Sequence, residues 1–360
     1  MSFKPSLRDV LPAGLHEEAR SVLAARPDLS AGTPWFVNAL TGFGAWLASF
    51  FLMGFLALGV VIGKEGGAIV MGLGIVTGTV VVMRGKKHNV FLGQLLLAMG
   101  LAGQGLIIGG VVGLLSENSP IIPATVLVLQ GVLLLVHPSV VQRFLSSLFA
   151  SIALLLLVRQ LAPSVLVDVA LVGLALLVHL LFLRQASLQR GFLGEGVLPV
   201  AFGIVTTLLW ELLERDWFRN FYSTFLWHQD EQRLPSGVLT LGLAAVTLYS
   251  AWRMLEEMGA EVSGTAGVTT FASLGALALF TLQTPGIIAA CGLLMLGFHR
   301  RSAVLMGMAV LFILCFGSTY YYNLELTLLA KSLALLGSGL ILLGLRLFAL
   351  RRFPALEEVR

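Results

Sequence analysis

The sequence predicts an all-α fold, a polytopic transmembrane helical bundle of about twelve spans with both termini in the cytoplasm (N-in and C-in). Composition gives the first indication, because 57% of the 360 residues are hydrophobic, only 12% are charged and the mean hydropathy is +0.93. Soluble globular proteins carry about 25% charged residues. Several apolar runs also reach the roughly 20 residues that a helix needs to cross about 30 Å of hydrocarbon.

Residues 1–34 form a short N-terminal segment that we expect in the cytoplasm. They contain charges throughout and no apolar stretch before Trp35, so they do not resemble a cleavable signal peptide. The transmembrane helical domain covers 35–350, and a cytoplasmic tail covers 351–360. Lipid offers no partners to backbone polar groups, so the apolar runs are expected to be helices. They lie at about 35–62, 66–83, 90–115, 120–136, 140–158, 164–183, 196–213, 236–255, 264–282, 285–298, 302–317 and 325–346.

The connecting segments alternate in charge, which predicts the orientation. With twelve spans, 17 of the 23 Lys and Arg residues fall on the cytoplasmic side, and cytoplasmic loops of membrane proteins are enriched in these residues. The turn before Pro285 is the critical point. If 264–298 were one kinked helix, every later segment would change sides and the asymmetry would vanish. We therefore expect a helical hairpin there, with the single kinked helix as the alternative.

The outer segment 214–235 is unusually aromatic. Its aromatic side chains recur at helical spacing, with polar residues on the opposite face, which predicts an amphipathic helix at the outer membrane boundary. An interfacial anchor, a lid over a cavity and a docking surface for a partner are the alternatives. Candidate interface residues are Trp217, Phe218, Phe221, Tyr222 and Phe225, together with Tyr321 and Tyr322 near the last span.

Ionisable residues inside membrane spans are costly and therefore mark candidate functional sites. Asp168 and His179 share the sixth span, and their spacing places them on one helix face about 16 Å apart in height. Lys331 and Glu325 belong to the last span. These four residues form the candidate intramembrane polar site. Solvation at the helix ends and snorkelling of Lys331 are the structural alternatives, as is an ion pair of Lys331 with Glu117, Asp168 or Glu211.

No motif for catalysis, metal or nucleotide binding fits its context. The glycine pattern at residues 72–78 lies inside a span rather than between a strand and a helix. Gly105, Gly109 and Gly113 repeat every four residues, which is typical of close helix packing. We therefore expect no catalytic residues, no metal, no cofactor and no nucleic-acid partner, and a protein that is not an enzyme.

Two segments resemble a known family. They are YYYNLELTLLAKSLALLGSGLILLGLR, from Tyr320 to Arg346, and PWFVNALTGFGAWLASFFLMGFL, from Pro34 to Leu56. Both are similar to segments of a bacterial family of polytopic inner-membrane proteins with a domain-of-unknown-function label. That family is often encoded beside a smaller membrane protein with a GDYxxLxY motif. The resemblance implies a bacterial inner (plasma) membrane location and a companion protein. It singles out Tyr321, Tyr322, Leu324, Thr327, Leu328, Leu329, Lys331 and Ser332.

A transporter or permease is the first functional hypothesis, an assembly component is its alternative, and an intramembrane enzyme is the least favoured, because no second metal ligand or Ser–His pair accompanies His179. The number of spans and the intramembrane polar residues favour a transporter or permease. The scarcity of charge at mid-membrane and the implied companion favour a non-catalytic assembly or scaffold component. A polar cavity around Asp168, His179 and Lys331 would support transport, whereas a filled core would support assembly. The lipid bilayer is a partner in both cases, and the oligomeric state stays open.

Overall fold

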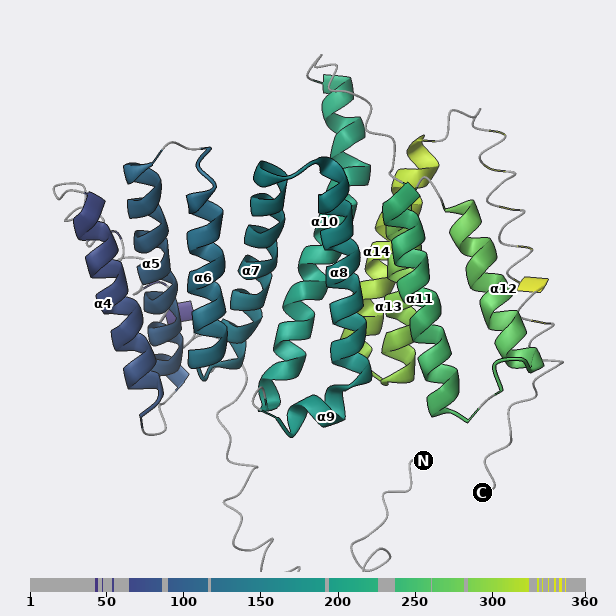
Figure 1. Ribbon diagram of the computed structural model, residues 1–360, viewed down its shortest axis with the longest axis horizontal. Coiled ribbons are helices and arrows are strands. Elements are labelled where there is room, and N and C mark those ends of the chain that lie inside the picture. The colour runs from purple at the N-terminus through teal and green to yellow at the C-terminus, as the bar shows by residue number, and fades with distance from the viewer. Residues whose placement is uncertain are drawn as a thin grey trace, which may run out of the picture. The chain divides into compact units, whose positions relative to one another are not determined.

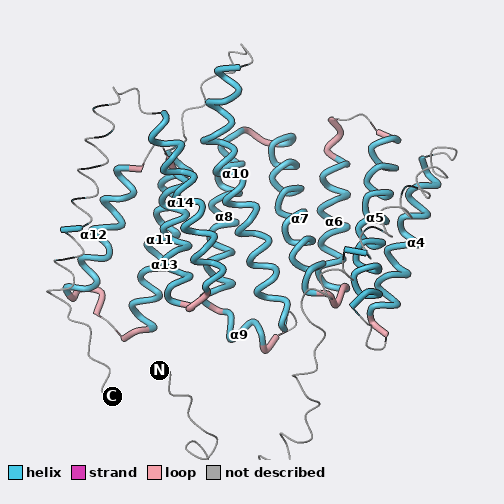
Figure 2. The backbone as a smooth tube through the Cα atoms, turned by 180° about the vertical axis from the view of Figure 1, so that it is seen from behind, coloured by secondary structure: helices cyan, strands magenta, loops and turns pink. Residues whose placement is uncertain are grey.

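The computed structural model describes residues 65–85, 90–115, 118–191, 194–225, 237–259, 261–281 and 284–323, with scattered single positions elsewhere. Every regular element in these ranges is helical (Figure 1, Figure 2), which confirms the predicted fold class there. The helices are α4 (Glu65–Met83), α5 (Val90–Leu114), α6 (Ile121–Val136), α7 (Val140–Leu161), α8 (Ser164–Leu183), α9 (Gln185–Gln189), η3 (Gly194–Gly196), α10 (Val197–Phe225), α11 (Gly237–Glu257), α12 (Thr265–Phe280), α13 (Pro285–His299) and α14 (Ala303–Asn323).

The long helices agree with the second to the eleventh of the predicted spans. Six described helices are long and apolar enough to cross a membrane, and four shorter apolar helices accompany them. The first and last predicted spans, 35–62 and 325–346, lie outside the described ranges except for single positions. The count of twelve spans and the N-in, C-in orientation therefore stay predictions.

Prolines mark the starts of three helices. Pro120 precedes α6 and Pro163 precedes α8, while Pro285 is the first residue of α13. Proline suits these positions because the first N–H groups of a helix have no partner within the helix. Since α12 ends at Phe280 and α13 starts at Pro285, the segment 264–298 is two helices and not one kinked helix.

The chain divides into two compact units, Met1–Gly110 and Val111–Arg360. In the first unit, α4 and α5 approach closely through glycines. A Cβ added to Gly72 would lie 2.6 Å from the carbonyl oxygen of Gly103, and one added to Gly110 would lie 2.6 Å from Ile69. Gly105 and Gly109 have no such neighbour among the described residues, so the predicted glycine face is not the one that α4 contacts.

In the second unit, each helix packs on the next one around a common core. Helix α7 packs on α6 and α10, α8 on α10 and α11, and α13 on α11 and α14, while α12 packs on α11. The buried core comes mainly from α8, α10, α11 and α13, with Phe316 of α14 and Leu155 of α7 fully enclosed. These helices therefore hold the residues of the candidate site.

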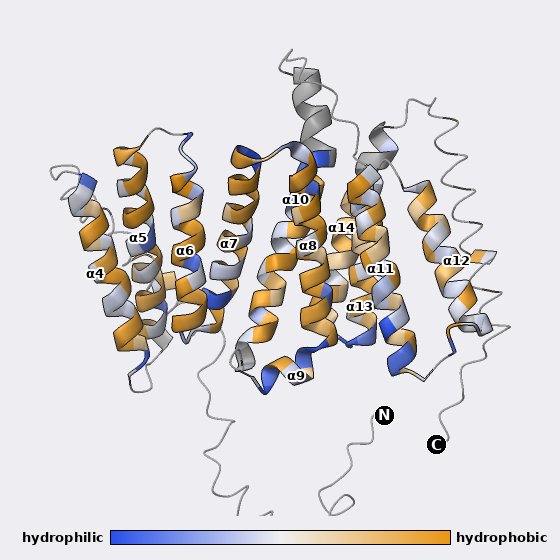
Figure 3. Cartoon of the chain, viewed as in Figure 1, coloured by the Kyte–Doolittle hydropathy of each residue, from blue (hydrophilic) through white to orange (hydrophobic). Residues whose placement is uncertain are grey.

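The outward faces of the helices are apolar as well. Leu279 is 70% exposed and Phe298 is 77% exposed. Figure 3 shows hydrophobic residues along the middle of the helices and hydrophilic residues gathered near their ends. Soluble monomers rarely expose such large apolar patches, whereas a lipid environment favours them. The chain is therefore a membrane protein.

Two predicted boundaries are wrong. The aromatic segment begins as a continuation of α10, which runs without interruption to Phe225 and extends beyond the neighbouring helices (Figure 1). It is not a separate helix in the plane of the interface, because the charged residues after Leu213 end the apolar run without ending the helix. The predicted eleventh span likewise ends too early, because α14 continues past residue 317 through the tyrosine run to Asn323.

Candidate functional site

Four charged side chains meet where α7 ends and α8 begins. The guanidinium of Arg159, near the end of α7, donates to the carboxylate of Glu211 on α10. One turn later on α10, Arg215 donates to the carboxylate of Asp168 on α8. Both carboxylate side chains are only 6% exposed, whereas the two arginines are about one-third exposed. We call these four residues the charge cluster.

The local sequence explains how α10 forms ion pairs with both α7 and α8. Glu211 and Arg215 are four residues apart, so they lie one turn apart on the same side of a helix. Helix α10 packs between α7 and α8, and each of its two charges meets an opposite charge on one of them. The charge cluster therefore ties three helices together at one end of the core.

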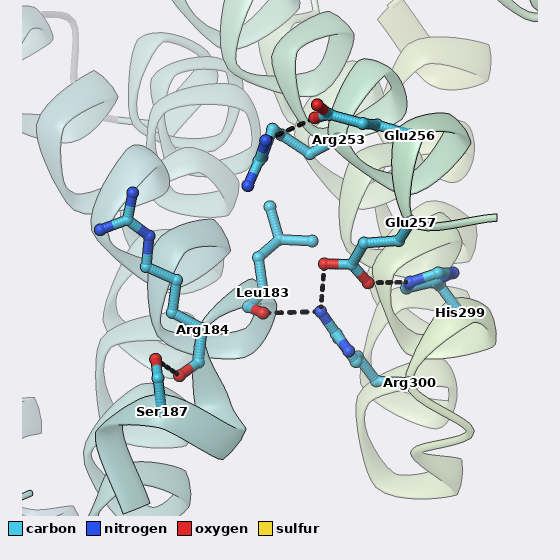
Figure 4. A network of polar contacts seen from close by, with 8 residues as sticks. All are labelled: Leu183, Arg184, Ser187, Arg253, Glu256, Glu257, His299 and Arg300. Atoms are coloured by element: carbon cyan, nitrogen blue, oxygen red, sulfur yellow. Dashed lines mark hydrogen bonds and ion pairs between the residues drawn. The ribbon is translucent and has the colours of Figure 1, made fainter. Parts of the chain in front are cut away.

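A second polar network lies at the other end of α8 (Figure 4). The carboxylate of Glu257, the last residue of α11, accepts from Arg300 at 2.9 Å and lies 2.9 Å from Nε2 of His299. Arg300 also donates to the carbonyl oxygen of Leu183 at 2.7 Å. The ends of α8, α11 and α13 therefore meet here.

This network also gives the relative direction of α12 and α13. Helix α13 ends at the network, whereas α12 begins near it, because α12 starts shortly after α11 ends. The two helices therefore run in opposite directions, as the predicted hairpin requires.

His179 lies between these two ends, inside the core. Its side chain is buried, and Nδ1 lies 2.8 Å from the carbonyl oxygen of Ala175 in its own helix. Nε2 has no hydrogen-bond partner among the described residues. Nε2 faces α13, because a Cβ added to Gly292 of α13 would lie 3.4 Å from Nε2. The same Cβ would lie 2.7 Å from Oγ1 of Thr247 of α11. The imidazole therefore fills a tight junction of α8, α11 and α13.

The described residues include only part of the predicted polar site. Asp168 and His179 both lie on the buried face of α8, as predicted. Leu171, Ala175 and Val178 fill that face between them and are at most 1% exposed. Lys331 and Glu325 lie outside the described residues.

The predicted interface residues are only partly described. Tyr321 is half-buried on the last turn of α14. The backbone of Tyr322 and of five aromatic residues lies on helices, but their side chains are outside the described part: Trp217, Phe218, Phe221, Tyr222 and Phe225.

Sequence reasoning missed the two arginines of the charge cluster. Arg159 and Arg215 both follow apolar runs and belong to the six Lys and Arg residues that the predicted twelve-span arrangement places on the outer side. Glu211 and Asp168, two of the acids considered for Lys331, are each paired with one of these arginines. The four-residue spacing of Glu211 and Arg215 was the available signal, but the partner helices depend on tertiary packing.

The charge cluster pairs two acids with two bases, which suits helix association better than metal binding. No group of three or more His, Cys, Asp or Glu side chains that could hold a metal ion occurs in the described ranges. In a comparison with known families, a family model described as a domain of unknown function, DUF4401, matches residues 34–352. Searches of curated proteins and of solved structures found no match.

Proposed function

The chain belongs to the DUF4401 family, whose function is unknown, and on that premise we propose that it is a non-catalytic assembly component of the membrane. In this proposal the helical core holds a companion membrane protein. By the family resemblance, the companion is the smaller GDYxxLxY protein and the membrane is a bacterial inner membrane. The observation that carries the proposal is the filled core between Asp168 and His179.

The packing of α8 supports assembly over transport. A transport path requires polar groups that face water or a substrate at mid-membrane. Here Asp168 is paired with Arg215, and the side chains of Leu171, Ala175 and Val178 separate it from His179. Leu208 and Leu209 of α10 and Leu293 of α13 are also fully enclosed in the same core. The described core is therefore closely packed, which favours an assembly component over a transporter.

The extension of α10 supports a docking role. The apolar span of this helix ends at Arg215, whereas the helix ends at Phe225. Ten further residues extend a helix by about 15 Å. The aromatic residues of this extension recur at helical spacing, and an amphipathic helix of this kind can bind an apolar groove of a partner. Aromatic residues are also frequent among those that dominate binding energy.

Co-purification with the companion tests the proposal. The chain and the GDYxxLxY protein are co-expressed, and the tagged chain is isolated in a mild detergent. We expect a stoichiometric complex, and at least a tenfold loss of companion when Trp217 and Phe221 are both replaced by Ala, because each such aromatic can contribute 2 kcal/mol or more.

The matched control carries Asn220→Ala and Ser223→Ala, which lie on the polar side of the same helical pattern. This control is expected to retain the companion within about twofold. Isolation of the bare chain, or equal losses in the aromatic and polar variants, would contradict the proposal.

Transport remains the second candidate because of His179. An imidazole nitrogen without a partner in a buried site is unusual, since most buried polar atoms are hydrogen-bonded. A proton carrier would need such a group, together with a water path to it. Replacing His179 with Gln should leave companion binding unchanged if the chain is an assembly component, and should abolish solute-driven proton uptake by vesicles if it is a transporter.

A further inference from the structure

A groove runs between α8 and α11 on the outside of the core. Its volume is about 570 Å³, within the range of about 300–1,000 Å³ that is typical of small-molecule sites. Six apolar residues and Tyr249 line it, with Arg184 at the end of α8. The apolar residues are Val172, Leu176, Leu180, Gly242, Ala245 and Val246.

The groove begins where the two helices touch. A Cβ added to Gly242 would lie 2.4 Å from Val172, so α8 and α11 are in close contact at that level. From Val172 to Arg184 the chain rises twelve residues, or about 18 Å. Half of a bilayer's hydrocarbon core is about 15 Å thick. The groove therefore has the length of one lipid leaflet, with its arginine at headgroup level.

Arg184 supplies a charge that no described residue of the protein neutralises. Its side chain is exposed and forms no hydrogen bond or ion pair within the described part of the chain. The neighbouring carboxylates are engaged elsewhere: Glu257 binds His299 and Arg300, and Glu256 binds Arg253 (Figure 4). An anionic group at the mouth of the groove would therefore meet an available guanidinium, which binds phosphate through two parallel hydrogen bonds.

We propose that this groove binds an anionic phospholipid of the bilayer. One acyl chain lies along Val172, Leu176 and Leu180, and the phosphate of the headgroup binds Arg184. Tyr249, one further turn along α11 from Ala245, lines the same groove, and its hydroxyl can donate to the glycerol or headgroup oxygens. Basic pockets between transmembrane helices are a recurrent form of anionic-lipid site.

Native mass spectrometry in mixed micelles tests the site, with phosphatidylglycerol and phosphatidylcholine of equal chain length as probes. We expect the wild-type protein to retain one phosphatidylglycerol with about a fivefold preference over phosphatidylcholine, the magnitude expected for one arginine near the headgroups. Arg184→Gln should remove the preference. Ala245→Phe fills the groove with an aromatic ring and should lower the retention of both lipids.

Two control variants separate the groove from the rest of the surface. Arg301→Gln removes an exposed arginine of the turn beside Arg300, and Val169→Phe adds an aromatic ring at an exposed position of α8 outside the groove. Both should bind as the wild type does. Three results would overturn the proposal: no lipid preference in the wild type, an equal loss in Arg301→Gln, or unchanged retention in Ala245→Phe. Soluble glycerol phosphate should not compete, and competition by it would indicate a phosphate site without an acyl-chain groove.

Discussion

Replacing Arg159 with Gln is expected to destabilise the protein by about 3 kcal/mol or more, and by more than replacing its partner Glu211 with Gln. Removing Arg159 leaves the buried carboxylate of Glu211 without its partner, and an unpaired buried charge typically costs about 3–5 kcal/mol. The two partners differ in burial, because the side chain of Glu211 is 6% exposed and that of Arg159 is 37% exposed. An unpaired Arg159 can extend toward water, but an unpaired Glu211 cannot.

The measurement is the free energy of unfolding of each variant in the same detergent micelles. Arg253→Gln is the control, since its pair with Glu256 is exposed and within one helix turn, and such pairs contribute about 0–1 kcal/mol. Combining Arg159→Glu with Glu211→Arg should recover part of the loss. If Glu211→Gln were the more destabilising change, or if the control cost as much, the charge cluster would not hold the helices together.

Adding one methyl group to Gly203 is expected to destabilise the bundle by about 1–3 kcal/mol, the usual cost of overpacking a dense core. Gly203 is where α10 approaches α7. A Cβ there would lie 2.0 Å from Oγ of Ser147 and 2.5 Å from the carbonyl oxygen of Phe144. The second of these atoms belongs to the backbone, so α7 and α10 would have to separate.

The matched control is Gly173→Ala in α8. A Cβ at that position would meet nothing within 4 Å among the described residues. Alanine favours a helix over glycine by roughly 0.5–1 kcal/mol, so this variant should be as stable as the wild type or more stable. Thermal unfolding midpoints in micelles compare the two. Similar midpoints for both variants would mean that α7 and α10 do not pack through Gly203.

Most helix positions could be predicted from the sequence because lipid leaves the backbone few alternatives. An apolar run of about 20 residues must form a helix there, and prolines such as Pro120, Pro163 and Pro285 place the helix starts. The end of α10 was predicted poorly. Its apolar run stops before Glu214, but Glu and Arg have high helix propensity, so hydropathy and helicity end at different residues.

The contacts between helices could not be predicted in the same way. The four-residue repeat of Gly105 and Gly109 indicated a close contact, yet close contacts occur at other glycines, among them Gly72, Gly203 and Gly242. Periodicity shows which residues share a face but not which face meets a neighbour. The ion pairs of the charge cluster could not be predicted for the same reason, because predicting them requires knowing that α10 packs between α7 and α8.

The central proposal is a filled membrane core without an aqueous path from Asp168 to His179. Cysteine accessibility measures this directly. Cys291 and Cys315 are first replaced by Ser, and Ala175→Cys and Ser187→Cys are then introduced separately. Ala175 is 1% exposed in the core, whereas Ser187 lies on the exposed helix α9. The membranes are prepared so that the reagent reaches both of their faces. A charged thiol reagent should then label Cys at 187 rapidly and should leave Cys at 175 unlabelled over the same period. Labelling of position 175 at a rate comparable to that of position 187 would contradict the filled core and would favour a water-accessible transport path.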